Sequence, residues 1–129
     1  MDKVEHFEIP ADDHDRALRF YTEVFGWELN PIPGVRYTRL LTKRVNDDDL
    51  GPRPFEVNGA IITRTKELQH PFVTITVADI EKTLKRISEE GGKVLTGKTP
   101  FGSPPRGYIA YFKDTEGNTV GLWQFAPRP

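Results

Sequence analysis

Two patterns of apolar residues follow one another near the start of the chain and predict a strand and then a helix. From Val4 to Ile9, apolar and polar residues alternate with a period of two, as in a half-buried strand. Pro10 to Asp13 then provides a turn and an N-cap carboxylate, so the helix is expected to begin near Asp13. Gly26 stands where the C-terminal cap of this helix belongs. The residues spaced for one apolar stripe on it are His14, Leu18, Tyr21 and Phe25.

Three more strands are expected before the middle of the chain, over Trp27 to Leu29, Val35 to Lys43 and Val57 to Arg64. The stretch from Asn46 to Glu56 is rich in Asp, Gly and Pro and has no periodicity. Its acidic run is similar to a calcium-binding loop, but Leu50 occupies a ligand position. We expect a solvated loop there that acts as a flap over a cleft.

The second half of the chain repeats the order of the first. When the sequence is shifted by 66 positions, His6 to Leu29 lies on Phe72 to Leu95, and Gly26 falls on Gly92. The match indicates a duplication, and we expect a single α+β domain over residues 1–129, with module one at about 1–66 and module two at about 70–129. The elements expected in module two are a strand over Phe72 to Val77, a helix from Asp79 to about Glu90, and strands over Lys93 to Thr96, Tyr108 to Lys113 and Asn118 to Gln124.

The period-two pattern also predicts which face of the sheet the helices cover. An unbroken apolar face made of Phe7, Ile9, Val73, Ile75 and Val77 is expected to pack against the helices. The opposite face carries a mixed polar and aromatic set that is typical of a ligand cleft. Its members are His6, Glu8, Phe72, Thr74 and Thr76.

Composition narrows the possible partners. Lys and Arg number 18 against 19 Asp and Glu, a net charge of −1, which disfavours nucleic acid and anionic membranes. There is no cysteine, so disulfides, thiolate metal sites and thiol nucleophiles are excluded. No signal-peptide core and no long apolar run is present in this sequence, and the cytoplasm is therefore the expected compartment.

Several motifs in a fixed order resemble the vicinal oxygen chelate superfamily, which includes glyoxalases, bleomycin resistance proteins and extradiol dioxygenases. The motifs are His6 to Ile9, Arg16 to Tyr21, Val24 to Trp27, Tyr111 to Asn118, and Val120 to Gln124. The resemblance covers nearly the whole chain. It implies two paired βαβββ modules that form a curved mixed sheet around a cleft, with the helices on the outer face, and it implies a homodimer.

In metal-dependent members of that superfamily, four strand residues converge on one divalent ion. His6 falls at the first of these positions, but Phe72, Gly121 and, at the least securely aligned position, Ile61 fall at the others. An aromatic ring, a hydrogen atom and an alkyl group have no lone pair to donate, so His6 is the only surviving family ligand. We therefore expect no cofactor, and a divalent metal is left open only through replacement ligands such as Glu8 or His70.

His6 and Glu8 are the candidate catalytic residues. His6 is suited to a general base or to a ligand hydrogen bond, and the alternative is a ring that a neighbouring carboxylate or carbonyl satisfies. Glu8 on the cleft face is expected to be exposed, protonated or matched by Arg39, Arg64 or Arg106.

Trp123 and Phe72 are expected to line a pocket for a flat apolar ligand, and Gly121 leaves room beside the indole ring of Trp123. Tyr37, Tyr108 and Tyr111 belong either to this pocket or to the core.

A phosphate-loop pattern occurs at Gly92 to Thr99, but we reject it as a nucleotide site. The phosphates of such a site lie at the N-terminus of a following helix, and Pro100 opposes a regular helix here.

The function favoured by these observations is metal-independent binding of a small apolar or aromatic molecule. Two kinds of enzyme remain as alternatives: a metal-dependent lyase, isomerase or dioxygenase with a non-standard ligand set, and a cofactor-free enzyme that uses His6 and Glu8. The third possible function is that of a domain that binds a partner and takes no ligand. The expected pocket residues are His6, Glu8, Ile61, Phe72, Thr74, Gly121 and Trp123.

Overall fold

The computed structural model describes residues 2–42 and 57–127 of the chain. The first half consists of β1 (Lys3–Ala11), α1 (His14–Phe25), β2 (Glu28–Pro31), β3 (Tyr37–Leu41) and β4 (Gly59–Thr63). The second half consists of β5 (Phe72–Thr76), α2 (Ile80–Glu89), β6 (Lys93–Phe101), β7 (Gly107–Lys113) and β8 (Thr119–Phe125). The order strand, helix and three strands therefore occurs twice, as the sequence predicts. The loop expected over Asn46 to Glu56 lies outside the described residues.

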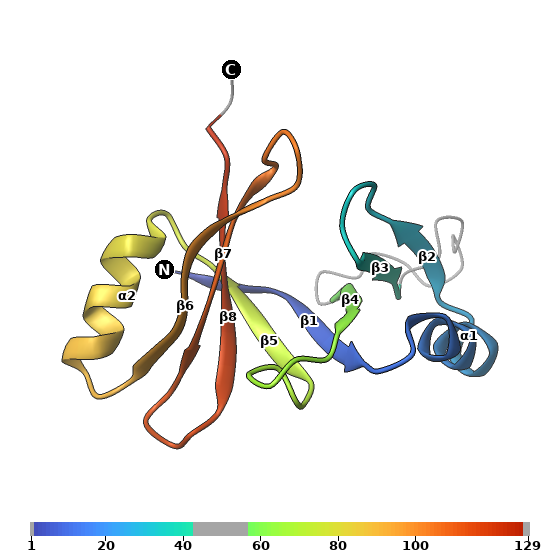
Figure 1. Cartoon of the computed structure of the whole chain (residues 1–129), viewed down its shortest axis with the longest axis horizontal. Coiled ribbons are helices and arrows are strands. Elements are labelled where there is room, and N and C mark those ends of the chain that lie inside the picture. Colours follow the sequence, from blue (N-terminus) through green and yellow to red (C-terminus); the bar gives the residue numbers. More distant parts are fainter. Residues whose placement is uncertain (1, 43–56, 128–129) are drawn as a thin grey trace, which may run out of the picture.

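All of these strands form one open sheet in the order β2-β3-β4-β1-β5-β8-β7-β6. The two halves meet where β1 pairs with β5 in antiparallel fashion, and each of these central strands pairs in parallel with the last strand of its own half. The two helices lie at opposite ends of the molecule, each beside the strands of its own half (Figure 1). The α+β class and the mixed sheet made of paired βαβββ units are thus confirmed.

Both helices begin at the aspartates that the sequence marked. The carboxylate of Asp13 accepts from the backbone N–H of Arg16 at 3.0 Å, and that of Asp79 accepts from the N–H of Lys82 at 3.1 Å. Gly26 closes α1 in the left-handed conformation, at φ 70°, and its N–H donates to Thr22. Local capping chemistry therefore sets these helix ends, which is why the sequence located them.

The helices pack on one face of the sheet through two separate apolar clusters. Under α1 lie Ala11, Leu40 and Ile61, with Phe7 and Ile9 against them. Ile80 and Leu84 of α2 pack there on Val77, Ala110, Phe112 and Leu122, with Ile75 against them. Val73 departs from the expected pattern because it is 40% exposed. It sits on the central strand β5 and belongs to neither of the two clusters beneath the helices.

β6 is longer than the sequence predicts, since it runs to Phe101 instead of Thr96. Register shifts against β7 interrupt its alternation, and Pro100 lies within it. β6 lies at the edge of the sheet, where a proline is tolerated because one side of the strand needs no hydrogen-bond donors. Because Gly92 to Thr99 leads into and forms this strand rather than a helix, the rejection of a phosphate loop is confirmed.

In the described part of the chain, neither helix has the length and hydropathy needed to cross a bilayer.

Candidate functional site

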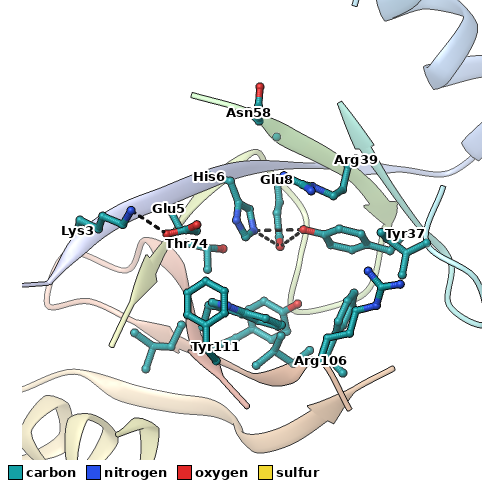
Figure 2. A pocket seen from close by; sticks show the side chains of 17 residues that line it. Lys3, Glu5, His6, Glu8, Tyr37, Arg39, Asn58, Thr74, Arg106 and Tyr111 are labelled. Carbon is teal, nitrogen blue, oxygen red and sulfur yellow. Dashed lines mark hydrogen bonds and ion pairs between the residues drawn. The ribbon is translucent and has the colours of Figure 1, made fainter. Parts of the chain in front are cut away.

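A cavity of about 550 Å³ lies on the sheet face opposite the helices. Residues of both halves line it, with β1 and β3 on one side and β7 and β8 on the other (Figure 2). Its volume falls within the roughly 300–1,000 Å³ that is usual for small-molecule sites. The period-two pattern of β1 places His6 and Glu8 here and sends Phe7 and Ile9 to the helix face.

Three polar side chains meet at one wall of the cavity. Nε2 of His6 lies 2.9 Å from Oε1 of Glu8, and the hydroxyl of Tyr37 lies 3.4 Å from the same oxygen. The Tyr37 hydroxyl also lies 3.2 Å from Nε2 of His6. When Glu8 is ionised, its Oε1 accepts from the His6 N–H and from the Tyr37 O–H. Figure 2 shows the three side chains pointing toward one another from β1 and β3.

Glu8 is only 3% exposed. Its second oxygen, Oε2, is buried and has no hydrogen-bond partner among the described residues. Thr74, on the neighbouring strand, likewise keeps its hydroxyl buried without a partner there. An unpaired buried polar group costs about 1–3 kcal/mol, and such costs are found preferentially at functional sites.

The two tyrosines near Glu8 are held in the protonated form. Burial raises the pKa of Tyr37 far above its ordinary value, and the charge of Glu8 raises it further, whereas Arg39 opposes the shift. Burial and the Glu8 charge raise the pKa of Tyr111 in the same way. Both hydroxyls therefore remain hydrogen-bond donors throughout the physiological pH range.

Aromatic rings form much of the remaining wall. Phe101 packs edge-on against Tyr37 at 5.0 Å and against Trp123 at 5.6 Å between ring centroids. Trp123 in turn packs edge-on against Phe125 at 5.7 Å. These contacts join β3, β6 and β8 into one aromatic surface that can bury a flat apolar group.

The structure brings four of the predicted pocket residues to the cavity, namely His6, Glu8, Thr74 and Trp123. Phe72 lies in a cluster behind the cavity wall, where its ring meets Tyr111 at 5.7 Å. Gly121 lies directly beside Thr74 on the adjacent strand.

Ile61 is placed on the other face of the sheet, fully buried under α1 with Leu40 and Ala11. The cavity-side neighbour of Glu8 on β4 is Ala60, its register partner. The position expected at Ile61 therefore falls one residue earlier, at Ala60. A difference of one residue along a strand moves the side chain to the opposite face of the sheet.

The partner of Glu8 is His6, which agrees with the alternative in which a neighbouring carboxylate satisfies the His6 ring. The expected exposure of Glu8, or its pairing with an arginine, is not found among the described residues. Arg64 instead donates to Asp12 at 3.0 Å. His14 is likewise engaged elsewhere, 2.8 Å from the hydroxyl of Thr38, and His70 is exposed and does not line the cavity.

Sequence reasoning missed Phe101 and Phe125, which line the cavity from the ends of β6 and β8. It left Tyr37 undecided between pocket and core. The sequence did show that Tyr37 and Arg39, two residues apart, point to the same face of their strand. Nothing in the local sequence showed that this face turns toward His6.

The four positions implied by the resemblance do not fit a divalent ion. A Cβ atom at Gly121 would come within 2.5 Å of the Thr74 hydroxyl, so that oxygen already takes the space of a longer side chain. Phe72 and Ala60 offer no donor atom. Among the described residues, no three His, Asp or Glu side chains are grouped as metal ligands would be. That the protein works without a metal stays a prediction.

Comparisons with known proteins place these observations in a family. Residues 3–122 match the family described as Glyoxalase/Bleomycin resistance protein/Dioxygenase superfamily. A "glyoxylase-like domain-containing protein" of Didymella fabae is 29% identical over 125 residues, covering 93% of this chain and 91% of its own. The protein YurT of Bacillus subtilis (strain 168) is 32% identical over 120 residues, covering 88% and 92%.

Among solved structures, a methylmalonyl-CoA epimerase of Streptomyces coelicolor superposes with a TM-score of 0.64 at 21% identity and covers 97% of this chain and 98% of its own. At that identity the likeness shows the fold alone.

Proposed function

This chain belongs to the Glyoxalase/Bleomycin resistance protein/Dioxygenase superfamily, as its motifs predicted, and we propose that it binds a small organic molecule directly through its side chains, without a divalent metal. The observation that carries the proposal is the cavity of about 550 Å³, which has a buried polar cluster on one wall and aromatic rings on another. This combination of apolar area with a few fixed polar groups is typical of small-molecule sites.

The two walls have different roles in the proposed binding. Phe101, Trp123 and Phe125 bury the apolar part of the ligand, which supplies most of the affinity. Glu8 and Thr74 fix its orientation, since each has a buried oxygen that lacks a partner among the described residues. A hydroxyl, amide or amine N–H of the ligand can donate to Glu8 once its terminal torsion turns Oε2 toward the cavity, and that torsion is soft.

A second function, cofactor-free acid–base catalysis, is favoured by one specific contact. Glu8 and His6 are 2.9 Å apart in a largely buried setting, so a proton taken up by one can be shared with the other. The protonated Tyr37 hydroxyl beside them can stabilise a developing negative charge. Such a set of groups suits proton transfer to or from a bound carbon or oxygen acid.

The binding proposal is tested with phenylnaphthylamine, a neutral aromatic amine that fluoresces in apolar surroundings. We expect saturable binding that weakens about tenfold or more in Trp123→Ala, as for the loss of a central aromatic contact. Phe25→Ala, which removes an exposed ring on α1, is the matched control and should leave the affinity unchanged. Thermal unfolding of each variant shows whether it is folded during the titration.

Two results would sink the proposal: no saturable binding to the wild type, or equal weakening in both variants. A requirement for added manganese or nickel would overturn the metal-free part. For the catalytic alternative, the organic molecule retained by the protein in native mass spectrometry is incubated with it in deuterated water. Deuterium uptake with the wild type but not with Glu8→Gln supports catalysis, and equal uptake with both contradicts it.

A further inference from the structure

Charged side chains at the cavity are not balanced locally. Five line it: Lys3, Glu5, Glu8, Arg39 and Arg106. Nζ of Lys3 lies 3.5 Å from Oε2 of Glu5, so these two charges compensate each other. Glu8 is engaged by His6 and Tyr37, and no described arginine lies within ion-pair distance of it. Among the described residues of the lining, the two arginines are the cations without a carboxylate partner.

Within residues 2–42 and 57–127, neither Arg39 nor Arg106 has a carboxylate within ion-pair distance. They come from different halves of the chain, since Arg39 belongs to β3 and Arg106 directly precedes β7. Figure 2 shows the two side chains on opposite sides of the Tyr37 ring. Two guanidinium groups that pair with no described carboxylate thus line a single cavity.

The backbone holds Arg106 in this position. Its N–H donates to the carbonyl of Phe101 at 2.8 Å, and its own carbonyl accepts from Ala126 at 3.2 Å. Arg39 is fixed by the pairing of β3 with β4 opposite Ala60. Both side chains therefore start from ordered backbone, although each remains accessible to a ligand.

The charges also define the direction in which a ligand would lie. A negative group next to the buried carboxylate of Glu8 would be repelled strongly in a setting of low dielectric constant. The same group near the arginines would find planar donors that match carboxylate, phosphate or sulfonate oxygens. Apolar walls around the cavity concentrate the field of these arginines at its mouth.

We propose that the cavity takes an organic anion, in which an aromatic or apolar body lies against the Phe101 and Trp123 wall and an acidic group lies between Arg39 and Arg106. The inference rests on the proposed small-molecule function and specifies its ligand class. A neutral hydrogen-bond donor on the body faces Glu8.

A pair of matched probes tests the inference. Anilinonaphthalene sulfonate has the same rings and amine as phenylnaphthylamine and adds one sulfonate. We expect the sulfonate probe to bind about tenfold more tightly, and Arg39→Gln and Arg106→Gln each to reduce that advantage about fivefold, in keeping with partly exposed charge pairs. Neither substitution should change the affinity for the neutral probe.

Arg86→Gln is the matched control, because it makes the same change of charge on α2, outside the cavity. It should leave both affinities as they are. Trp123→Ala should weaken both probes together, which shows that the sulfonate probe sits in the cavity and not on the exposed rings of α1.

The outcomes separate this inference from the function on which it rests. The proposal that the ligand is an organic anion is overturned if the two probes bind equally tightly. It is also overturned if the sulfonate probe still binds more tightly after both arginine substitutions. In either case small-molecule binding stands. Failure of both probes to bind overturns the proposed function itself. If Arg86→Gln reduces the tighter binding of the sulfonate probe as much as the two cavity substitutions do, the effect belongs to the overall charge of the protein. That result would also overturn the inference.

Discussion

The two halves of the chain have the same order of elements but contribute different things. α2 buries Ile80 and Leu84 in its cluster, whereas α1 has no fully buried residue and leaves Phe20 and Phe25 more than half exposed. At the cavity, the first half supplies the polar wall with His6, Glu8, Tyr37 and Arg39. The second half supplies the apolar and aromatic residues Phe101, Ile109, Tyr111, Leu122, Trp123 and Phe125.

The difference shows how a duplicated unit can divide its tasks. The shift of 66 positions that aligns the halves places Phe72 on His6 and Thr74 on Glu8, so the polar pair of β1 has an apolar and an uncharged counterpart on β5. The last strands are alike at this point, since the small residues Ala60 and Gly121 pair with Glu8 and Thr74. Equivalent positions of one architecture thus carry ionisable side chains in the first half and uncharged ones in the second.

The largest expected effect comes from a matched pair of leucines. Leu84→Ala should lower the free energy of unfolding by about 2–5 kcal/mol, because Leu84 is only 9% exposed in the α2 cluster. Leu18→Ala, at the equivalent position of α1, should cost about 1–2 kcal/mol because that side chain is only partly buried. Urea unfolding followed by circular dichroism measures both. An equal or larger loss at Leu18 would show that α1 is covered in solution and would break the comparison.

A smaller effect is expected at Gly121, a position on β8 that has no side chain. Gly121→Ala places a Cβ 2.5 Å from the Thr74 hydroxyl and should cost about 1–3 kcal/mol of unfolding free energy. Gly97→Ala is the control, because nothing lies within 4 Å of its Cβ, and its effect should stay within about 1 kcal/mol.

Adding Thr74→Ala should relieve most of the Gly121→Ala cost, since it removes the clashing oxygen. A double-mutant cycle measures this coupling as at least about 0.5 kcal/mol. Strict additivity of the two substitutions would mean that the contact between β5 and β8 does not limit the site.

The smallest expected effect concerns what the halves share. Asp13→Ala and Asp79→Ala should each lower the free energy of unfolding by about 1 kcal/mol, since each carboxylate caps its helix in the same way. Asn at the same positions keeps the acceptor and should cost little. Thermal and urea unfolding compare the four variants. If only one of the two Ala substitutions lowers the free energy of unfolding, the two helices differ at their N-termini as well as in their burial.

Much of the fold could be predicted because its signals are local. Alternation over Val4 to Ile9 gave a strand and its two faces, and Asp13, Gly26 and Asp79 gave helix ends, since each acts on residues within a few positions along the chain. The motifs indicated the family because each of them is a short run of neighbouring residues. The end of β6 was missed because an edge strand tolerates Pro100, and only the neighbouring strands show that it is an edge.

What the sequence determined by itself was the set of elements, their duplication, and the presence of His6, Glu8, Thr74 and Trp123 on strand faces that lie opposite the helices. The tertiary structure alone decided that Tyr37 reaches Glu8, that Phe101 closes the aromatic wall, and that Ile61 lies under α1. The physical reason is that side-chain period follows from backbone geometry within one strand. Contacts between strands depend on register and on long-range pairing, where a shift of one residue exchanges the two faces.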